Sequence, residues 1–368
     1  MKDPVDGADL GDLVSEGVSP WLDGLDRRLS GSGWFASVAG PKGLRGAMMN
    51  LGTLLESLES EEGPARRSAR PALAGVDVEN AVMTLILDEA RTACDVLNEV
   101  FTDSDGYDGQ VSVDLPARVA HDAGAAVAAA ERVVAELDRP NVMVKLPATA
   151  AGLAATRSCL SRGIGVHVTG VCSPGRYGQV VDAWFDGMEA AAVAGLRLAT
   201  IPSVAAAPVG RIDQEVDARL AASSAVTHPL RGRAALATAQ LLYHEYEQRL
   251  GSSRWRGLQA SGARPQRLAW TATTPAEAGY AVRIVGWGTV TAMSPAVLDA
   301  LGRAGELAGD TLLGEHGAAS AVIGGLDGLG MDLGAVVRTL EADGVEREAR
   351  YWSDLCAVVR ARSAGPGT

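Results

Sequence analysis

One lysine stands out among the residues that could do chemistry, because it interrupts an apolar run. Lys145 lies in the segment Asn141–Leu146, which reads Asn-Val-Met-Val-Lys-Leu and has a proline on either side. Burial favours the neutral amine, and a neutral amine attacks carbonyl groups to form an imine. The structural alternative is a lysine that reaches solvent between helices or pairs with a buried carboxylate. The pattern alone leaves both interpretations open.

The elements around Lys145 follow an alternating order that is typical of βαβ units in a parallel sheet. We expect strands at residues 18–23, 44–49, 109–115, 141–146, 163–170, 197–203, 267–272 and 282–291. Apolar residues at helical spacing predict helices over 118–137 and 232–250. Eight such strands close into a barrel more readily than they form an open sheet, and no GxGxxG turn supports a dinucleotide-binding fold. The expected fold is therefore an α/β (β/α)8 TIM barrel, with additional helices after residue 295 packed outside it.

In a barrel of this kind the active residues come from the C-terminal ends of the strands. The polar residues expected at those ends, or within one turn of them, are Asp23, Asn50, Asp114, Lys145, Thr169 and Arg211. The two aspartates are candidate proton shuttles, although a helix cap or a salt bridge explains them equally well. The threonine could orient a water molecule or simply favour the strand, and the arginine could hold a phosphate or an ordinary ion pair. His167 alternates with apolar residues, which by itself suggests a core histidine.

The composition excludes several classes of partner and site. The 45 acidic and 33 basic residues give a net charge of −12 without a basic block, which argues against nucleic acid or a membrane surface as partner. No apolar run is long enough to span a membrane, and the start of the chain lacks the apolar stretch of a signal peptide. The cysteines lack zinc spacing and are expected to be reduced: Cys94, Cys159, Cys172 and Cys356. We therefore expect a cytoplasmic protein without a metal.

Residues 1–368 are expected to form a single barrel domain. Within it, residues 60–76 are polar and carry the run Ser-Glu-Glu-Gly-Pro-Ala-Arg-Arg, which predicts a surface excursion after the second strand. Residues 362–368 end in Ala-Gly-Pro-Gly-Thr and are expected to be a disordered tail. The oligomeric state stays open, with a homo-oligomer among the alternatives.

The segment around Lys145, Asn141–Thr149, resembles the Schiff-base segment of transaldolases, a class I aldolase-like family. Other segments resemble that family in the same order: Trp21–Asp23, Asp88–Leu97, Val111–Asp114, Arg118–Asp122, Val166–Thr169, Ser173, Arg176–Tyr177, Ser203–Ala205, Arg211–Asp213, Arg254–Gln266 and Ala292–Pro295. The resemblance covers nearly the whole chain, in the long form typical of actinobacterial transaldolases. It implies a transferase of carbohydrate metabolism, in the pentose phosphate pathway.

The resemblance also implies a role for each candidate residue. Lys145 would form the imine with a ketose, and Asp23 would deprotonate the hydroxyl beside the breaking carbon–carbon bond. The remaining roles would be contacts to substrate or water: Asn50 with the hydroxyls of the three-carbon unit, Asp114 and Thr169 with the assisting water, Arg211 with the phosphate, and His167 in place of a substrate-binding asparagine. The implied partners are small sugars or sugar phosphates. No cofactor is implied, because the protonated imine is itself the electron sink.

Departures from the family gather at the expected barrel mouth. Asp114 replaces a glutamate, Ala206 replaces a serine, and Ala272 and Ala276 stand where the family has a serine and a phosphate-binding lysine. These changes predict poor selectivity for phosphorylated sugars. Two alternatives follow: a pathway-specific Schiff-base enzyme on a non-standard or non-phosphorylated carbonyl compound, and an inactive transaldolase-like binding module. The presence of Lys145, Asp23 and Asn50 together speaks against the second.

Overall fold

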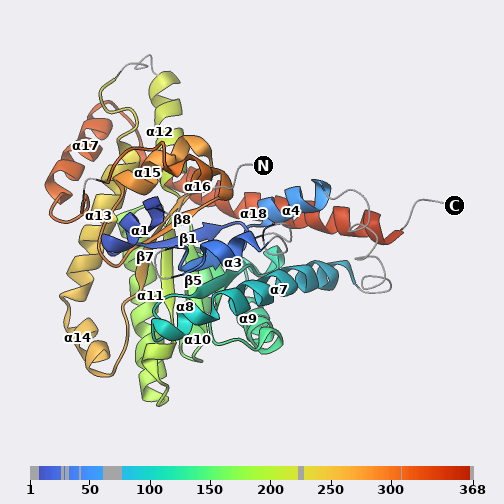
Figure 1. The fold of residues 1–368 in the computed structure, drawn as a ribbon. Helices are drawn as coiled ribbons and strands as arrows, with labels where there is room; N and C mark the ends of the chain where they lie inside the picture. The colour runs from blue at the N-terminus through green and yellow to red at the C-terminus, as the bar shows by residue number, and fades with distance from the viewer. Residues whose placement is uncertain are drawn as a thin grey trace.

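The computed structural model describes residues 8–25, 29, 33–40, 43–60, 77–222, 228–307 and 309–364. Eight parallel strands form a closed barrel in chain order, with β8 hydrogen-bonded to β1 (Figure 1). The strands are β1 (Ser19–Asp23), β2 (Gly46–Met48), β3 (Gln110–Val113), β4 (Val142–Pro147), β5 (Gly165–Thr169), β6 (Ser203–Ala207), β7 (Arg267–Ala272) and β8 (Val290–Met293). The predicted (β/α)8 barrel is confirmed.

Helices follow or precede each strand and form the outer layer of the molecule. They are α1 (Ala8–Ser15), α3 (Trp34–Val38), α4 (Leu51–Ser60), α7 (Val78–Val96), α8 (Asn98–Asp103), α9 (Ala123–Leu137), α10 (Ala150–Leu160), α11 (Pro174–Val193), α12 (Val209–Ala222), α13 (Ala234–Leu250), α14 (Ser253–Ala260), α15 (Ala278–Arg283), α16 (Pro295–Leu301), α17 (His316–Gly328) and α18 (Leu333–Ala364). Three single turns of 3-10 helix are η1 (Ala117–Val119), η2 (Leu198–Thr200) and η3 (Pro275–Glu277).

Two of the eight predicted strands are misplaced along the chain. The run 197–203 holds η2, and β6 begins only at Ser203, in a segment whose alanines give little β signal. The run 282–291 contains the end of α15 and a loop, and β8 begins at Val290. Ile284 and Val285 in that loop are fully buried by packing rather than by strand pairing. The apolar residues therefore identified correctly which positions are buried, but not whether those positions lie in a strand, a helix or a loop.

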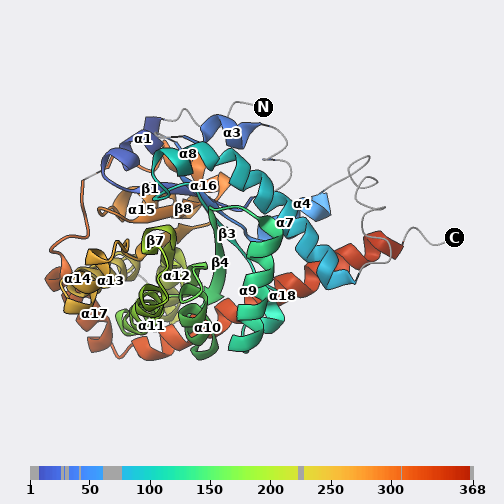
Figure 2. The same ribbon diagram turned by 90° about the horizontal axis from the view of Figure 1, so that it is seen from below.

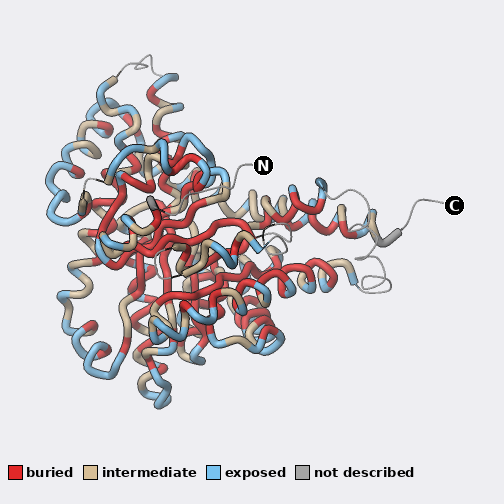
Figure 3. Tube along the Cα trace, in the orientation of Figure 1, coloured by how far each residue is buried: buried red, intermediate tan, exposed pale blue. Residues whose placement is uncertain are grey.

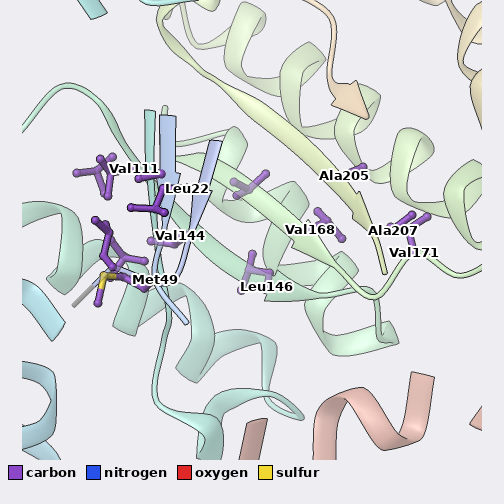
Figure 4. Packing of buried hydrophobic residues seen from close by; sticks show 14 of the residues in the cluster. Leu22, Met49, Val111, Val144, Leu146, Val168, Val171, Ala205 and Ala207 are labelled. Carbon is purple, nitrogen blue, oxygen red and sulfur yellow. The ribbon is translucent and has the colours of Figure 1, made fainter. Parts of the chain in front are cut away.

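Alternation along the strands divides the core into two layers. Side chains that point outward, such as Leu22, Val144 and Val168, pack against the surrounding helices, and Figure 4 shows part of this layer. Side chains that point inward fill the barrel, among them Trp21 and Met143. In Figure 3 the barrel is almost continuously buried, whereas the outer faces of the helices are exposed. The inward-pointing positions at the strand ends are therefore the ones that can face a substrate.

A buried ion cluster closes the N-terminal end of the barrel. Asp108 is fully buried and pairs with Arg267 at 2.9 Å and with Arg45 at 2.8 Å. Its Oδ1 also accepts a hydrogen bond of 2.5 Å from the hydroxyl of Ser19. Since catalytic residues of such barrels lie at the opposite end, this cluster is read as structural.

Helix α18 is a 32-residue helix that ends the described chain. It packs on α4, α7, α12 and η1, which are far apart in sequence, and Figure 2 shows it crossing much of the width of the molecule. The helices after residue 295 do pack outside the barrel, as predicted, but α18 lies over the C-terminal ends of the strands. It continues to Ala364, so residues 362–364 of the predicted tail are helical. Residues 365–368 and the predicted excursion after Ser60 lie outside the described residues.

Two further features of the described residues concern membranes and metals. No single helix there is long and apolar enough to cross a membrane. Among the described helices, only α17 and α18 taken together reach the required length and hydropathy, and this pair is bent by 98°. No group of three or more histidine, cysteine or acidic side chains in the described part could hold a metal ion. The four cysteines are buried and unpaired with one another.

Candidate active site

A cavity of about 430 Å³ opens at the C-terminal end of the barrel. Its wall contains all six polar residues that were predicted at or just after the strand ends: Asp23, Asn50, Asp114, Lys145, Thr169 and Arg211. Parallel strands bring their carboxyl ends to the same edge, which explains how residues almost 200 positions apart in sequence come together. One side of the cavity is formed by α18 rather than by the barrel.

The position of Lys145 follows from the local sequence. The β-branched residues before it favour a strand, and Pro147 ends that strand. The hydroxyl of Thr149 then accepts the backbone N–H of Gly152 at 3.1 Å and caps α10. Lys145 thus lies two residues before the end of β4. Its side chain points into the cavity and is only 10% exposed.

The Lys145 amine contacts a carboxylate and a backbone carbonyl. Its Nζ donates to Asp114 Oδ2 at 3.2 Å and to the carbonyl oxygen of Met49. Burial acts to lower the pKa of Lys145, but the carboxylates of Asp114, Asp23 and Glu348 act to raise it, and the pKa is raised overall. Burial by itself acts in the expected direction, towards the neutral amine, but the surrounding carboxylates outweigh it. The resting side chain is an ammonium ion, and a neighbouring group must take its proton before it can attack a carbonyl.

Asp23 and Asn50 form a fixed pair beside this amine. Asp23 is 1% exposed, and its Oδ1 accepts a hydrogen bond of 3.0 Å from Nδ2 of Asn50. The Oδ1 atom of Asn50 accepts hydrogen bonds from the backbone N–H groups of Gly52 and Thr53 at 3.0 and 3.2 Å, so Asn50 caps α4. Burial raises the pKa of Asp23, while Lys145 and Asn50 act to lower it. Asp23 is therefore a desolvated carboxyl with a raised pKa, placed within electrostatic reach of the Lys145 amine as a candidate proton acceptor.

Asp114 and Thr169 lie on the walls beside Lys145, and His167 does not. Burial raises the pKa of Asp114, against the lowering effect of the Lys145 charge. His167 is fully buried inside the barrel, where its Nδ1 lies 2.8 Å from the hydroxyl of Ser112. Burial lowers the pKa of His167 to about 3, so the ring is neutral. The predicted contact of His167 with substrate finds no support in this position, which is that of a core histidine.

Ala272 and Ala276, the two positions at and after the end of β7 that depart from the family, do not face the cavity. Thr271 lines it, whereas Ala272 points outward into the core between barrel and helices. Ala276 lies in η3 and is not part of the wall. The serine and lysine missing there therefore remove less from the cavity than the sequence suggested.

The loop after β7 is instead occupied by a carboxylate of the chain itself. Glu277 is 5% exposed and accepts the backbone N–H groups of Thr273 and Thr274 at 2.6 and 3.3 Å. It also accepts a hydrogen bond of 2.9 Å from Gln214. Backbone N–H groups at this end of the barrel commonly hold a phosphate in other barrels. Here the side chain of Glu277 already accepts their hydrogen bonds.

Residues of α18 were missed by the sequence analysis. Leu340, Glu341, Gly344, Val345, Arg347 and Glu348 all line the cavity. Their spacing of four and seven residues marks one face of a helix, which is the available signal. The spacing does not reveal that this face covers the barrel.

Glu348 adds a third carboxyl to the surroundings of the Lys145 amine. Burial and the charge of Asp114 raise the pKa of Glu348 to about 7, against the lowering effects of Lys145 and Arg347. The site thus combines one amine with three carboxyl groups whose pKa values are raised. Such a set can pass protons between an amine and a substrate.

Known proteins that are similar to this chain belong to one family. The Transaldolase/Fructose-6-phosphate aldolase family model matches residues 21–359. The chain is 38% identical to a transaldolase of Acidothermus cellulolyticus over 98% of this chain and 96% of that protein. It is 40% identical to transaldolase 1 of Streptomyces coelicolor, over 94% and 93%, and 38% identical to a transaldolase of Thermobifida fusca, over 95% and 96%. The chain therefore belongs to the transaldolase family and is a transferase of the transaldolase type.

Proposed function

We propose that the protein forms an imine between Lys145 and the carbonyl of a ketose, and transfers or cleaves a three-carbon ketol unit of a sugar or sugar phosphate. The observation that carries this proposal is the amine of Lys145 in a cavity beside Asp114 and Asp23. The composition adds support. The chain contains only three lysines, Lys2, Lys42 and Lys145, among its 33 basic residues. A chain that otherwise uses arginine has at this site the one basic side chain able to lose its proton and form an imine.

The reaction begins with removal of a proton from the Lys145 ammonium, and Asp114 is the carboxylate in contact with it. The neutral amine adds to the ketose carbonyl and forms a carbinolamine. Protonation of its hydroxyl, with Asp114 as donor and Thr169 orienting the departing water, releases water and leaves the protonated imine.

Cleavage then uses the second carboxylate. Asp23 takes the proton of the hydroxyl on the carbon beyond the bond that breaks, and a new carbonyl forms there as an aldehyde leaves. The electron pair of the broken bond moves into the imine and produces an enamine on Lys145. This enamine adds to an acceptor aldehyde and gives a new imine, which water hydrolyses to release the product and the Lys145 amine. Without an acceptor, protonation of the enamine and hydrolysis of the resulting imine release the three-carbon unit. The hydrogen bond from Asn50 keeps Asp23 in the orientation that this step requires.

A non-phosphorylated or otherwise non-standard carbonyl substrate is the second candidate. One observation favours it: Glu277 occupies the backbone N–H groups after β7, so a phosphate cannot bind there in the same way. The family is otherwise one that acts on sugar phosphates. Both candidates use the same chemistry at Lys145.

Borohydride reduction in the presence of fructose 6-phosphate or dihydroxyacetone tests the proposal, with the product read by intact mass and peptide mapping. We expect one adduct, on the peptide that contains Lys145, and none in Lys145→Ala. The matched control is Lys42→Ala, which removes a different lysine and should keep the adduct. Adducts that persist in Lys145→Ala, or no adduct with any carbonyl compound, contradict the proposal, and the second result identifies a binding module.

A further inference from the structure

Three arginines gather at one end of the cavity. Arg176 lies in the first turn of α11, Arg211 in the first turn of α12 and Arg347 in the middle of α18, and all three line the wall. All three charges also act on the same group, the buried thiol of Cys172. Burial raises the pKa of that thiol to about 12, and each of the three arginines acts to lower it. The three guanidinium groups therefore belong to one region of the wall.

The three arginines differ in how many hydrogen bonds and ion pairs they already make with other residues of the chain. Arg176 is held by two hydrogen bonds of 2.8 Å to Glu341 and by one of 2.7 Å to Gln179. Arg211 has its nearest carboxylate, Asp343, only at 4.0 Å. Arg347 makes no hydrogen bond and no ion pair with any residue in the part of the chain that the structure describes. Two cations thus face the cavity with most of their hydrogen-bonding capacity unused.

The acidic groups near Arg347 have other neighbours. Glu348, the next residue, is within electrostatic reach of Lys145 and Asp114, at the reacting end of the cavity. Glu341 is bound to Arg176. Asp343, one turn before Arg347 on α18, reaches Arg211 only at 4.0 Å and is half exposed. Three arginines against Glu341 and Asp343 leave one positive charge in excess, which favours an anion, and each guanidinium can donate two parallel hydrogen bonds to the oxygens of a phosphate.

We infer that Arg347 of α18 binds the phosphate group of the substrate, beside Arg211 of α12, to which the resemblance already gives that role. The subsite then lies between the barrel and the terminal helix, because Glu277 fills the position after β7. The part of the wall that comes from β7 contains no cation, and Arg347 of α18 supplies one. This inference rests on the proposed function for the identity of the substrate, and it predicts phosphate selectivity where the sequence alone predicted little.

The test compares Arg347→Gln with Arg350→Gln, a matched control that removes an exposed arginine three residues away on the same helix. Inorganic phosphate is the probe for the anion site, measured by calorimetry and as an inhibitor. Fructose 6-phosphate and dihydroxyacetone are the substrates, with and without phosphate. We expect Arg347→Gln to weaken phosphate binding and to raise KM for fructose 6-phosphate by about 10- to 100-fold, in line with the loss of charge-assisted hydrogen bonds. Trapping of dihydroxyacetone on Lys145 should change by less than about twofold, and Arg347→Lys should restore part of the phosphate affinity.

Three results overturn the inference. One is equal phosphate affinity in the unmodified protein and in Arg347→Gln. A second is equal loss of activity toward fructose 6-phosphate and dihydroxyacetone in the variant, which indicates that Arg347 only holds α18 in place. A third is the same loss in Arg350→Gln. Failure of the proposed function is distinguishable, since it abolishes trapping on Lys145 in the unmodified protein but leaves phosphate calorimetry as a direct measure of the subsite.

Discussion

Replacing Glu348 by glutamine should stabilise the protein against unfolding above neutral pH. Glu348 faces the cavity from α18, and burial together with the charge of Asp114 raises its pKa to about 7 from a usual value of 4.5. The nearby charges of Lys145 and Arg347 offset this only in part. Ionising the carboxyl in the folded protein is therefore unfavourable, and glutamine keeps its shape without the charge.

The sign and size of the effect follow from proton linkage. Below pH 4.5 the carboxyl is protonated in both the folded and the unfolded chain, and Glu348 costs nothing. Between pH 4.5 and about 7 the unfolded chain has released this proton while the folded protein still holds it, so the free energy of unfolding falls across this window and levels off above it. The interval between 4.5 and about 7 corresponds to at most about 3 kcal/mol. Because Glu348 is only half-buried, solvent screening reduces the expected loss to about 1–2 kcal/mol.

The assay is urea unfolding of the unmodified protein and of Glu348→Gln at pH 5 and at pH 8. The difference between their free energies of unfolding should shift in favour of the variant by about 1–2 kcal/mol between the two pH values. Glu346→Gln is the matched control, because Glu346 is exposed on the same helix and does not line the cavity. Its replacement should change the free energy of unfolding by less than about 0.5 kcal/mol.

A single outcome would refute this reasoning. If the difference between the unmodified protein and Glu348→Gln is the same at pH 5 and pH 8, the carboxyl ionises in the folded protein as it does in water. The placement of α18 over the reacting groups would then be wrong, since that placement is what desolvates Glu348 and brings it near Asp114.

Three further predictions concern other parts of the barrel. Asp23→Asn should still trap an imine with borohydride but lose carbon–carbon cleavage by ~10²–10⁴-fold, as measured by steady-state turnover; full turnover in the variant contradicts its role. Asp108→Ala should lower the free energy of unfolding by about 3–5 kcal/mol, because Arg45 and Arg267 lose their buried partner; a loss below about 1 kcal/mol in chemical denaturation contradicts this. Ala272→Ser should leave KM for fructose 6-phosphate unchanged within about twofold, because the side chain faces away from the cavity; a tenfold decrease contradicts that orientation.

Much of the fold and part of the site could be predicted from the sequence, for a geometric reason. Eight strands in βαβ order must run parallel, and parallel strands carry their C-terminal residues to one end of the barrel. Polar residues that follow apolar strands, such as Asp23 and Lys145, could therefore be assigned to a common cavity without coordinates. The predicted boundaries of β6 and β8 were wrong. The alanine-rich sequence of β6 gives little β signal, and the buried loop residues before β8 resemble a strand.

Side-chain orientation within the predicted site needed the exact register of the barrel. Ala272 and Thr271 are neighbours in sequence, yet only Thr271 faces the cavity, because successive strand residues point to opposite sides. His167 points inward too, but it lies deeper in the barrel, against Ser112. A shift of one residue reverses these assignments, and motif comparison alone does not resolve it.

The protonation state and the far wall of the cavity were decided by tertiary structure alone. The pKa of Lys145 depends on three carboxyl groups that come from β1, the end of β3 and α18, so no local pattern contains it. The periodicity of α18 identifies an inner face, but which surface that face covers depends on its packing against α4, α7 and α12. Arg347 and Glu348 enter the site only through this packing of segments distant in sequence, because contacts between such segments depend on the whole folded shape.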